Sequence, residues 1–351
     1  MTEKQIITNR YQNILIVRFS SIGDIIQCMS VLPGLKIANP KAVVHWIVRS
    51  DMATILEANP YIDRIHIFKK EKGLIGLIRF VINLRRLKFD LIYDAHKNIR
   101  SAIVRTILTP LPLRILGFAP KLVVRNKIRF RRFLFFKLGI RSAIKMPFKS
   151  FASFKKPLEK INALANLVEN TPWRFSAQTI AKTTSLTAKF ASKKWICLVP
   201  SAAHELKKWP VSYFQALIRQ LPEANFVIIG GPNDTFCEEI AATAPEQTIN
   251  LAGQTNLMES FHIVYSATAI VSGDTGFMHA ADLFRKPTIA LIGPSAFGFP
   301  SNPEVVVQRS DLKCMPCSKD GSGKCKAKTH KKCMLDIKPK TVAKILERIT
   351  R

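Results

Sequence analysis

Residues 14–24 read Ile-Leu-Ile-Val-Arg-Phe-Ser-Ser-Ile-Gly-Asp. The apolar run 14–17 predicts a short buried strand, and the small polar residues after it predict a turn. Apolar residues recur at helical spacing over 25–37, which predicts a helix that ends before Pro40. Strand, turn and helix in this order are the opening of a β-α unit.

The same order returns along the chain. Strands are expected over 43–48, 62–68, 89–94, 195–199, 225–229, 268–272 and 287–292, and helices over 52–58, 74–87, 211–220 and 339–351. A polar, proline-punctuated stretch at 145–193 separates the two series. We therefore predict the α/β class, with mostly parallel sheets in two Rossmann-like domains at 1–175 and 176–351.

Composition fits two globular domains but is strongly basic. The chain has 351 residues, of which 47% are hydrophobic and 22% charged, and this mixture excludes pervasive disorder and collagen-like or coiled-coil architectures. Lys and Arg total 54 against 24 Asp and Glu, a net charge of +30. Residues 1–175 hold 32 and 10 of these, and residues 176–351 hold 22 and 14. A polyanionic partner is thus expected mainly at the first domain.

Neither membrane-spanning nor secreted patterns are visible in the sequence. The longest apolar candidate, 74–84, is interrupted by Arg79, and the first residues lack the layout of a signal peptide. The seven cysteines are an odd number and few for this length, which argues against a secreted disulfide scaffold. A cytoplasmic location is therefore predicted.

Two segments place small residues where a strand gives way to a helix. In open parallel sheets, ligands bind beyond the carboxyl ends of the strands, and both 20–24 and 272–279 lie at such ends. The second reads Ser-Gly-Asp-Thr-Gly-Phe-Met-His, and its glycines with the following helix N-terminus suit a pyrophosphate. Equally, Asp274 or Thr275 can simply cap that helix. Neither segment is a Walker A or a Gly-x-Gly-x-x-Gly motif, and no Asp-x-Asp occurs in the sequence.

Five motifs follow one another along the chain. They are Arg-Phe-Ser-Ser-Ile-Gly-Asp at 18–24, Pro-Ser-Ala-Ala-His-Glu-Leu-Lys-Lys-Trp-Pro at 200–210, Gly-Gly-Pro-Asn-Asp at 230–234, Gly-Asp-Thr-Gly-Phe-Met-His at 273–279 and Lys-Pro-Thr-Ile-Ala-Leu-Ile-Gly-Pro at 286–294. Taken in this order, the motifs resemble those of glycosyltransferase family 9, the lipopolysaccharide heptosyltransferases. The resemblance spans nearly the whole chain. It implies a GT-B architecture, two Rossmann-like domains facing across a cleft, with the acceptor bound by the first and the nucleotide sugar by the second.

The resemblance implies an inverting, metal-independent transfer of heptose from ADP-heptose to the inner core of lipopolysaccharide, on Kdo-lipid A or heptosyl-Kdo-lipid A. The implied partners are the ADP-sugar donor, the anionic lipopolysaccharide precursor and the cytoplasmic surface of the inner membrane, where the enzyme would be peripheral. No cofactor is required and no specific nucleic acid is expected. Two alternatives stay open: a family member with another nucleotide sugar or acceptor, and a basic nucleic-acid-binding protein.

The resemblance also implies roles for single residues. Asp24 matches the family's proposed base, although it can instead cap the following helix. Residues expected at the donor are Ser201, Lys207, Asp234, Asp274, Thr275, Gly276 and His279, of which Lys207 is similar to the lysine that contacts the donor phosphates. Asp234 suits either the adenosine end or a plain turn. Arg18 and Arg100 are expected to bind the acceptor.

Two further clusters have open interpretations. Cys314, Cys317, Cys325 and Cys333 have a spacing feasible for a structural zinc site, but they also fit packed reduced thiols or a labile disulfide. The stretch 121–160 holds 13 Lys and Arg with one acid, and its segment 129–137 interleaves cations and phenylalanines. That segment fits docking on an anionic lipid acceptor, stacking on single-stranded nucleic acid, or a helix whose phenylalanines face the core.

Overall fold

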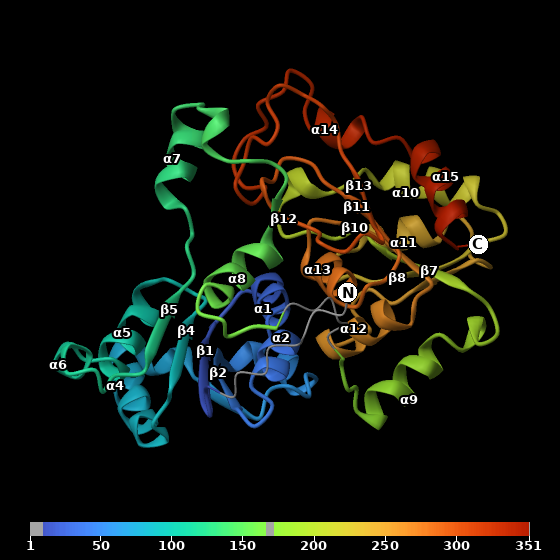
Figure 1. Ribbon diagram of the computed structural model, residues 1–351. Helices are drawn as coiled ribbons and strands as arrows, with labels where there is room; N and C mark the ends of the chain where they lie inside the picture. The colour runs from blue at the N-terminus through green and yellow to red at the C-terminus, as the bar shows by residue number, and fades with distance from the viewer. Residues whose placement is uncertain (1–9, 166–171, 351) are drawn as a thin grey trace, which may run out of the picture. The chain divides into compact units, whose positions relative to one another are not determined.

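The computed structural model describes residues 10–165 and 172–350, which divide into two units, each built around one large parallel sheet (Figure 1). Unit 1 comprises Met1–Ile128 and Phe151–Arg174, and unit 2 comprises Arg129–Ser150 and Phe175–Arg351. Both units alternate strands with helices, so the predicted α/β class is confirmed.

The sheet of unit 1 has the strand order β3-β2-β1-β4-β5, and every neighbouring pair is parallel. Its strands are β1 (Asn13–Val17), β2 (Val43–Arg49), β3 (Arg64–Phe68), β4 (Leu91–Asp94) and β5 (Lys121–Val124). Its helices are α1 (Ile22–Met29), α2 (Leu32–Ala38), α3 (Ala53–Glu57), α4 (Gly73–Leu84), α5 (Ile99–Leu108) and α6 (Leu111–Ile115), with most of α8 (Ser150–Glu159). The apolar run 14–17 forms the central strand and is fully buried, as its sequence predicts.

One helix predicted over 25–37 is two helices in the structure. The helix α1 ends at Met29, and α2 begins at Leu32 with Pro33 in its first turn. Proline has no N–H to donate, so it is tolerated in the first turn of a helix and breaks the hydrogen-bond ladder inside one. The position of Pro33 therefore explains why the periodic stretch divides.

The sheet of unit 2 has the order β13-β11-β10-β7-β8-β9, again with parallel neighbours. Its strands are β7 (Trp195–Val199), β8 (Asn225–Ile228), β9 (Thr248–Asn250), β10 (Ala269–Gly273), β11 (Thr288–Leu291) and β13 (Val305–Gln308). Its helices are α7 (Arg129–Lys137), α9 (Ala177–Leu186), α10 (Val211–Gln220), α11 (Phe236–Ala241), α12 (Leu257–Ser266), α13 (Gly276–Leu283), α14 (Lys332–Leu335) and α15 (Pro339–Thr350).

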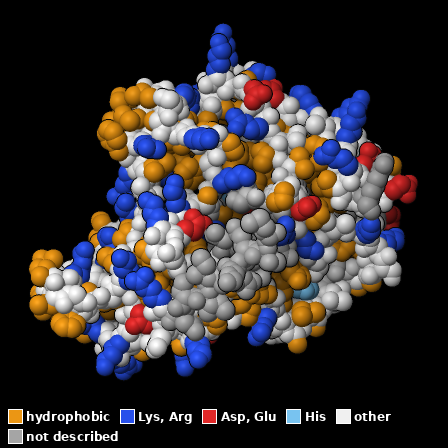
Figure 2. Space-filling view, viewed as in Figure 1, with side chains coloured by type: hydrophobic (Ala, Val, Ile, Leu, Met, Phe, Trp, Pro, Cys, Tyr) orange, Lys and Arg blue, Asp and Glu red, His pale blue; other side chains and the backbone are white. Residues whose placement is uncertain are grey.

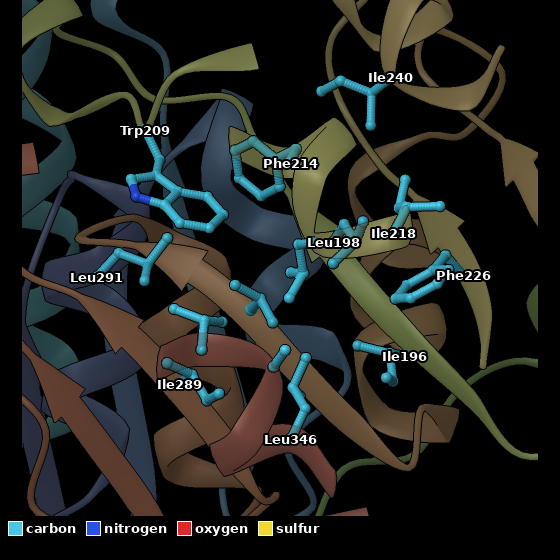
Figure 3. Packing of buried hydrophobic residues seen from close by; sticks show 14 of the residues in the cluster. Ile196, Leu198, Trp209, Phe214, Ile218, Phe226, Ile240, Ile289, Leu291 and Leu346 are labelled. Carbon is cyan, nitrogen blue, oxygen red and sulfur yellow. The ribbon is translucent and has the colours of Figure 1, made fainter. Parts of the chain in front are cut away.

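The core of unit 2 packs α10 and α15 against one face of this sheet. Side chains such as Leu198, Phe214, Phe226 and Leu346 are buried there together (Figure 3). Fully burying one such aliphatic or aromatic side chain contributes about 1.5–3 kcal/mol. This core fixes the strands whose ends carry the candidate site.

The segment 129–150 belongs to unit 2, whereas the sequence-based division places it in the first domain. Its short strand β6 (Phe148–Lys149) pairs with β12 (Phe297–Phe299), and the rings of Phe148 and Phe297 meet edge to face at 5.1 Å. This pairing joins residues about 150 positions apart. Neither segment has a hydrophobic periodicity from which a strand could be predicted. The polar stretch 145–193 contains β6, α8 and α9, and its residues 166–171 lie outside the described residues.

A pair of neutral histidines makes unit 1 sensitive to acid. His45 on β2 and His66 on β3 stack with parallel rings, and Nδ1 of His45 lies 2.9 Å from Nε2 of His66. Burial lowers the pKa of both, and that of His66 falls to about 4, partly because His45 is so close. In the neutral pair one ring nitrogen donates and the other accepts, an arrangement that two protonated rings cannot keep.

We expect the stability of unit 1 to fall as the pH drops from about 6.5 toward 4. In that pH range the unfolded chain protonates both histidines, whereas the folded chain keeps them neutral because their pKa values are lowered. Acid therefore favours the unfolded state. The variant His66→Gln should lose melting temperature less steeply between pH 7 and pH 5 than the wild type. Identical slopes in a pH series of thermal melts would contradict this account.

Candidate functional site

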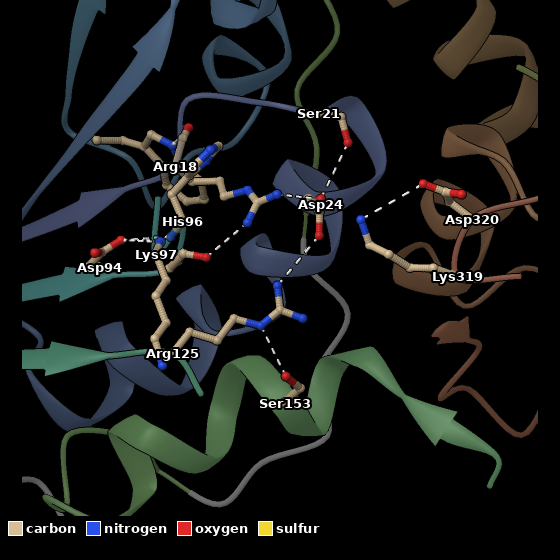
Figure 4. Close-up of polar contacts among 12 residues, drawn as sticks. Arg18, Ser21, Asp24, Asp94, His96, Lys97, Arg125, Ser153, Lys319 and Asp320 are labelled. Carbon is tan, nitrogen blue, oxygen red and sulfur yellow. Dashed lines mark hydrogen bonds and ion pairs between the residues drawn. The ribbon is translucent and has the colours of Figure 1, made fainter. Parts of the chain in front are cut away.

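A carboxylate held by two arginines lies at the carboxyl edge of the sheet of unit 1. Asp24, in the first turn of α1, forms ion pairs with Arg18, which follows β1, and with Arg125, which follows β5 (Figure 4). Nη1 of Arg125 is 3.5 Å from Oδ1 of Asp24. The arginine side chains are only 4% and 5% exposed, whereas that of Asp24 is 38% exposed. The carboxylate is therefore held in place on its inner side and accessible on its outer side.

Contacts deeper in unit 1 fix both arginines. Nη1 of Arg18 donates to the carbonyl oxygen of Ala95 at 2.9 Å. Nε of Arg125 donates to Oγ of Ser153 at 3.0 Å, and its guanidinium lies over the ring of Phe154 at 3.5 Å. Burial lowers the pKa of Arg125, and the charge of Asp24 opposes that effect. Removing the carboxylate would leave two buried cations without their counter-charge, which is costly.

Asp24 is not the N-cap of α1. The N-cap is Ser21, which has an extended backbone and makes no side-chain capping bond. The hydroxyl of Ser21 instead donates to Oδ2 of Asp24 at 3.4 Å. The carboxylate faces the two arginines, so these contacts do not support the capping alternative.

A second carboxylate at this edge has a structural role. Asp94, at the end of β4, is fully buried and accepts hydrogen bonds from the backbone N–H groups of His96 and Lys97, at 2.9 and 2.7 Å. It also accepts from Ser101 at 2.9 Å and pairs with Arg105 at 3.1 Å. These contacts hold the loop that leads into α5. Arg100, expected to bind the acceptor, is the second residue of α5 and is half-buried.

The corresponding edge of unit 2 carries a cluster of three polar side chains that are largely buried. Asp274 follows β10, and its carboxylate lies 3.0 Å from Nζ of Lys207 and 3.4 Å from Nε2 of His279. The three side chains are 9%, 12% and 7% exposed. Burial by itself would raise the pKa of Asp274, but the hydrogen bond from His279 and the charge of Lys207 outweigh it and lower that pKa to about 2. Asp274 is therefore ionised at neutral pH and anchors the lysine and the histidine.

Thr275, not Asp274, caps α13. It has the extended backbone of an N-cap residue, and its Oγ1 accepts from the backbone N–H of Met278 at 3.3 Å. Gly276 is the first residue of the helix. The capping alternative therefore holds for Thr275 alone, and the sequence-predicted residues Lys207, Asp274, Thr275, Gly276 and His279 come together at the start of α13.

Two glycines allow the backbone to approach Lys207 closely. A Cβ on Gly273 would lie 3.1 Å from the carbonyl oxygen of Lys207. Gly321 has φ +89°, and a Cβ there would lie 2.5 Å from Cγ of Lys207. Trp209, two residues further on, donates its indole N–H to the carbonyl oxygen of Ile337 at 2.9 Å and so ties the lysine's loop to the core. The stem of Lys207 is thus enclosed while its ammonium meets Asp274.

Ser201 and Asp234 contact each other. The Ser201 hydroxyl donates to Oδ2 of Asp234, and the same oxygen accepts the backbone N–H of Gly231 at 2.7 Å. These bonds close the turn that follows β8. The turn alternative for Asp234 thus has direct contacts, and the roles of both residues at a nucleotide stay predictions.

The four late cysteines are free thiols. Burial raises the pKa of Cys333 to about 11, and burial together with Cys314 and Cys325 raises the pKa of Cys317. In residues 10–165 and 172–350, no group of three or more His, Cys, Asp or Glu side chains is arranged to hold a metal ion. The thiols in this arrangement do not form a preassembled metal site, and the structural zinc stays a prediction.

Sequence reasoning missed Arg125, Ser153 and Gly321. Arg125 directly follows β5, so the rule that found Asp24 would have found it had that strand been predicted. Gly321 gave no signal, because its importance comes from a contact with a lysine more than a hundred positions away.

Within the part of the chain that the structure describes, no helix has the length and apolar character needed to span a bilayer.

Comparison with known proteins points to one family. The family model for glycosyltransferase family 9 (heptosyltransferase) matches residues 77–328. Lipooligosaccharide heptosyltransferase 2 of Campylobacter jejuni is 29% identical over 168 residues, 45% of this chain and 52% of that protein. The chain thus spans about half the length of this relative. Lipooligosaccharide heptosyltransferase 2 of Haemophilus influenzae is 24% identical over 295 residues, 81% of this chain and 84% of that protein.

Solved structures agree on the fold. The ADP-heptose LPS heptosyltransferase II of E. coli matches with a TM-score of 0.68 at 21% identity, covering 97% of this chain and 98% of that one. A glycosyltransferase family 9 protein of Veillonella parvula matches with a TM-score of 0.75 at 17% identity, covering 97% of both chains. At such identities the likeness shows the GT-B fold. Since the family model covers most of the sequence, the chain belongs to glycosyltransferase family 9.

Proposed function

We propose that the protein is an inverting transferase that moves heptose from ADP-heptose to the inner core of lipopolysaccharide. Family membership and the heptosyltransferase names of its relatives support this proposal. The observation that carries it is the buried triplet of Lys207, Asp274 and His279 beside the start of α13. A fixed cation next to the N–H groups of a helix N-terminus suits the pyrophosphate of a nucleotide sugar.

On the donor side, the residues of unit 2 would stabilise the leaving group. The bond between the anomeric carbon and the β-phosphate oxygen breaks, and ADP leaves with an additional negative charge. Lys207 and the N–H groups of Thr275 and Gly276 are preorganised donors for that charge, and such donors are most effective where charge develops. Asp274 would hold Lys207 and His279 in position. Lys207 supplies positive charge at the leaving group, so the transfer is proposed as metal-independent.

On the acceptor side, Asp24 would act as the general base. The acceptor hydroxyl loses its proton as it attacks the anomeric carbon, and the exposed side of the Asp24 carboxylate can take that proton. Arg18 is committed to Asp24 and to the carbonyl oxygen of Ala95, so we propose that it positions the base. Arg100 stays the proposed contact for acid groups of the acceptor.

The lipid acceptor would place the enzyme at the cytoplasmic face of the inner membrane. An anionic precursor agrees with the excess of Lys and Arg in residues 1–175. A different nucleotide sugar or acceptor within the family is the nearest alternative.

A thermal-shift panel separates these alternatives. ADP and ADP-heptose are expected to raise the melting temperature, since a ligand at 100 times its Kd stabilises the folded state by about 2.7 kcal/mol. UDP- and GDP-sugars should shift it much less. Stabilisation by UDP- or GDP-sugars alone would point to another donor, and stabilisation by RNA alone would contradict the transferase.

The variant Asp24→Asn tests the base. The amide cannot accept the proton, so kcat should fall by about 10²–10⁴ while ADP affinity stays unchanged. Its melting temperature should also fall, because Arg18 and Arg125 lose their counter-charge. Ser21→Ala is the matched control, since it removes only the hydroxyl that contacts Asp24, and it should keep near wild-type turnover. A less stable Asp24→Asn enzyme whose kcat stays within a few-fold of wild type would make Asp24 a purely structural anchor.

Gly321→Ala, with Gly323→Ala as its control, tests the enclosure of Lys207. Both glycines have φ near +90°, but only a Cβ on Gly321 meets the lysine side chain, while nothing lies within 4 Å at Gly323. Lys207→Ala should weaken ADP binding ten- to a hundredfold, the worth of a charge-assisted contact of about 1.5–3 kcal/mol. Gly321→Ala should weaken it at least threefold more than Gly323→Ala does. Equal ADP affinities for the two glycine variants, measured by calorimetry, would show that the enclosure has no effect on binding.

A further inference from the structure

The helix α4 of unit 1 exposes an unusual number of large aliphatic side chains. It buries Leu77, Val81 and Leu84 in the core of the unit. Four further residues, here called the α4 stripe, are exposed: Leu74 by 56%, Ile75 by 69%, Ile78 by 39% and Ile82 by 49%. They recur three, four and seven positions apart, so they lie on one face of the helix. Isolated exposed aliphatics are ordinary, but a continuous stripe marks an interaction site.

Cations surround the α4 stripe. Residues 69–88 contain seven Lys and Arg and a single acidic residue, Glu71. Arg79 follows Ile75 by four positions, so it lies next to the stripe on the helix surface. Arg86 is exposed in the 3-10 turn Arg85–Leu87 that directly follows α4. A helix that presents aliphatic side chains flanked by Lys and Arg has the composition of a helix that lies on an anionic bilayer.

A groove of about 550 Å³ adjoins the stripe, between α4 and the edge strand β3. Its apolar lining includes Ile67, Phe68, Ile75 and Phe80, and Lys72 and Arg79 also line it. The lining includes no acidic side chain. An apolar groove with cations on its wall fits a hydrocarbon chain that ends in an anionic headgroup.

The helix α6 and the loop after it add a second apolar feature, here called the α6 tip. It exposes Leu111, Ile115, Leu116 and Phe118 by 64–79%. Both α4 and α5 lead into parallel strands, so both run back to the edge of the sheet where the strands begin, and α6 follows α5 there. In the view of Figure 1, α4, α5 and α6 lie at the same end of unit 1, and Figure 2 shows hydrophobic and basic side chains together at that end.

We propose that the α4 stripe and the α6 tip dock unit 1 on the surface of an anionic lipid bilayer. For its physiological partner, the membrane that carries a lipid acceptor, the proposal rests on the proposed function. Charge favours this occupant over a second copy of the chain, because two such basic surfaces would repel each other, whereas anionic headgroups complement them.

The segment 129–137, the docking candidate from the sequence, is a weaker one in the structure. Phe135 of α7 is buried, and Phe136 packs against the ring of Phe297. The guanidinium of Arg132 lies 3.9 Å from the centre of that ring as well. Phe130 and Phe133 are the large hydrophobic residues that α7 exposes. Much of its basic and aromatic character is therefore used for packing within unit 2.

Vesicle co-sedimentation of the full chain tests the proposal. The probe is phosphatidylcholine vesicles with and without 30% phosphatidylglycerol, at low and moderate salt. The variant Ile75→Gln/Ile78→Gln/Ile82→Gln removes the exposed aliphatics and keeps a good helix former. It should bind anionic vesicles at least tenfold more weakly than wild type. Arg79→Gln/Arg86→Gln should lose about fivefold per residue at low salt and less when salt screens the charges.

The matched control is Phe130→Gln/Phe133→Gln, which removes exposed hydrophobic residues from α7 instead. It should bind vesicles like the wild type, and all variants should keep their ADP-induced thermal shift. Equal vesicle binding by wild type and the α4 variants, or a loss confined to the α7 variant, would overturn the proposal. A concentration-dependent dimer that the α4 variant abolishes, without vesicle binding, would make a second copy the occupant. If ADP does not raise the melting temperature of the wild type, that result would count against the proposed function alone.

Discussion

The parallel direction of every strand is the constraint on which this molecule depends. Parallel strands in a unit all end at one edge, so each loop that follows a strand reaches that same edge. In unit 1 this brings together Asp24 after β1 and Arg125 after β5, although 101 positions separate them. In unit 2 it brings Lys207 and Asp274 together from the loops after β7 and β10, which are neighbouring strands. The chemistry proposed for each unit follows from this geometry.

Buried cations at both edges are paired with a carboxylate of their own unit. Moving an isolated ion out of water costs a desolvation free energy of several kcal/mol, so a buried cation needs a carboxylate nearby. Asp24 forms ion pairs with two arginines in unit 1, and Asp274 forms an ion pair with Lys207 in unit 2. The two carboxylates differ in access, because Asp24 is partly open to solvent and Asp274 is nearly enclosed. This difference suits the proposed roles, in which Asp24 is the base that meets a substrate hydroxyl and Asp274 only holds a cation.

Two strands that lead to the site were predictable because each contains a short apolar run with small residues close behind it. The run 14–17 is followed closely by Ser20 and Ser21, and the apolar residues 269–271 are followed by Ser272 and Gly273, so both lead to site residues. The edge strand β5 was not predictable, since its four residues include a lysine and only Val123 is buried. Arg125 was therefore missed. Contacts set by tertiary packing, such as Phe148 with Phe297, leave no local pattern, which is why the segment 129–150 was assigned to the wrong half.

Direct analysis of the reaction product tests the central claim best. The full chain would be incubated with ADP-heptose and a delipidated inner-core acceptor, without added metal and with a chelator present. The account predicts an acceptor that gains one heptose by mass spectrometry, joined in the anomeric configuration opposite to that of the donor by NMR. A product that retains the donor configuration, or no heptose transfer from a donor that binds, would contradict it.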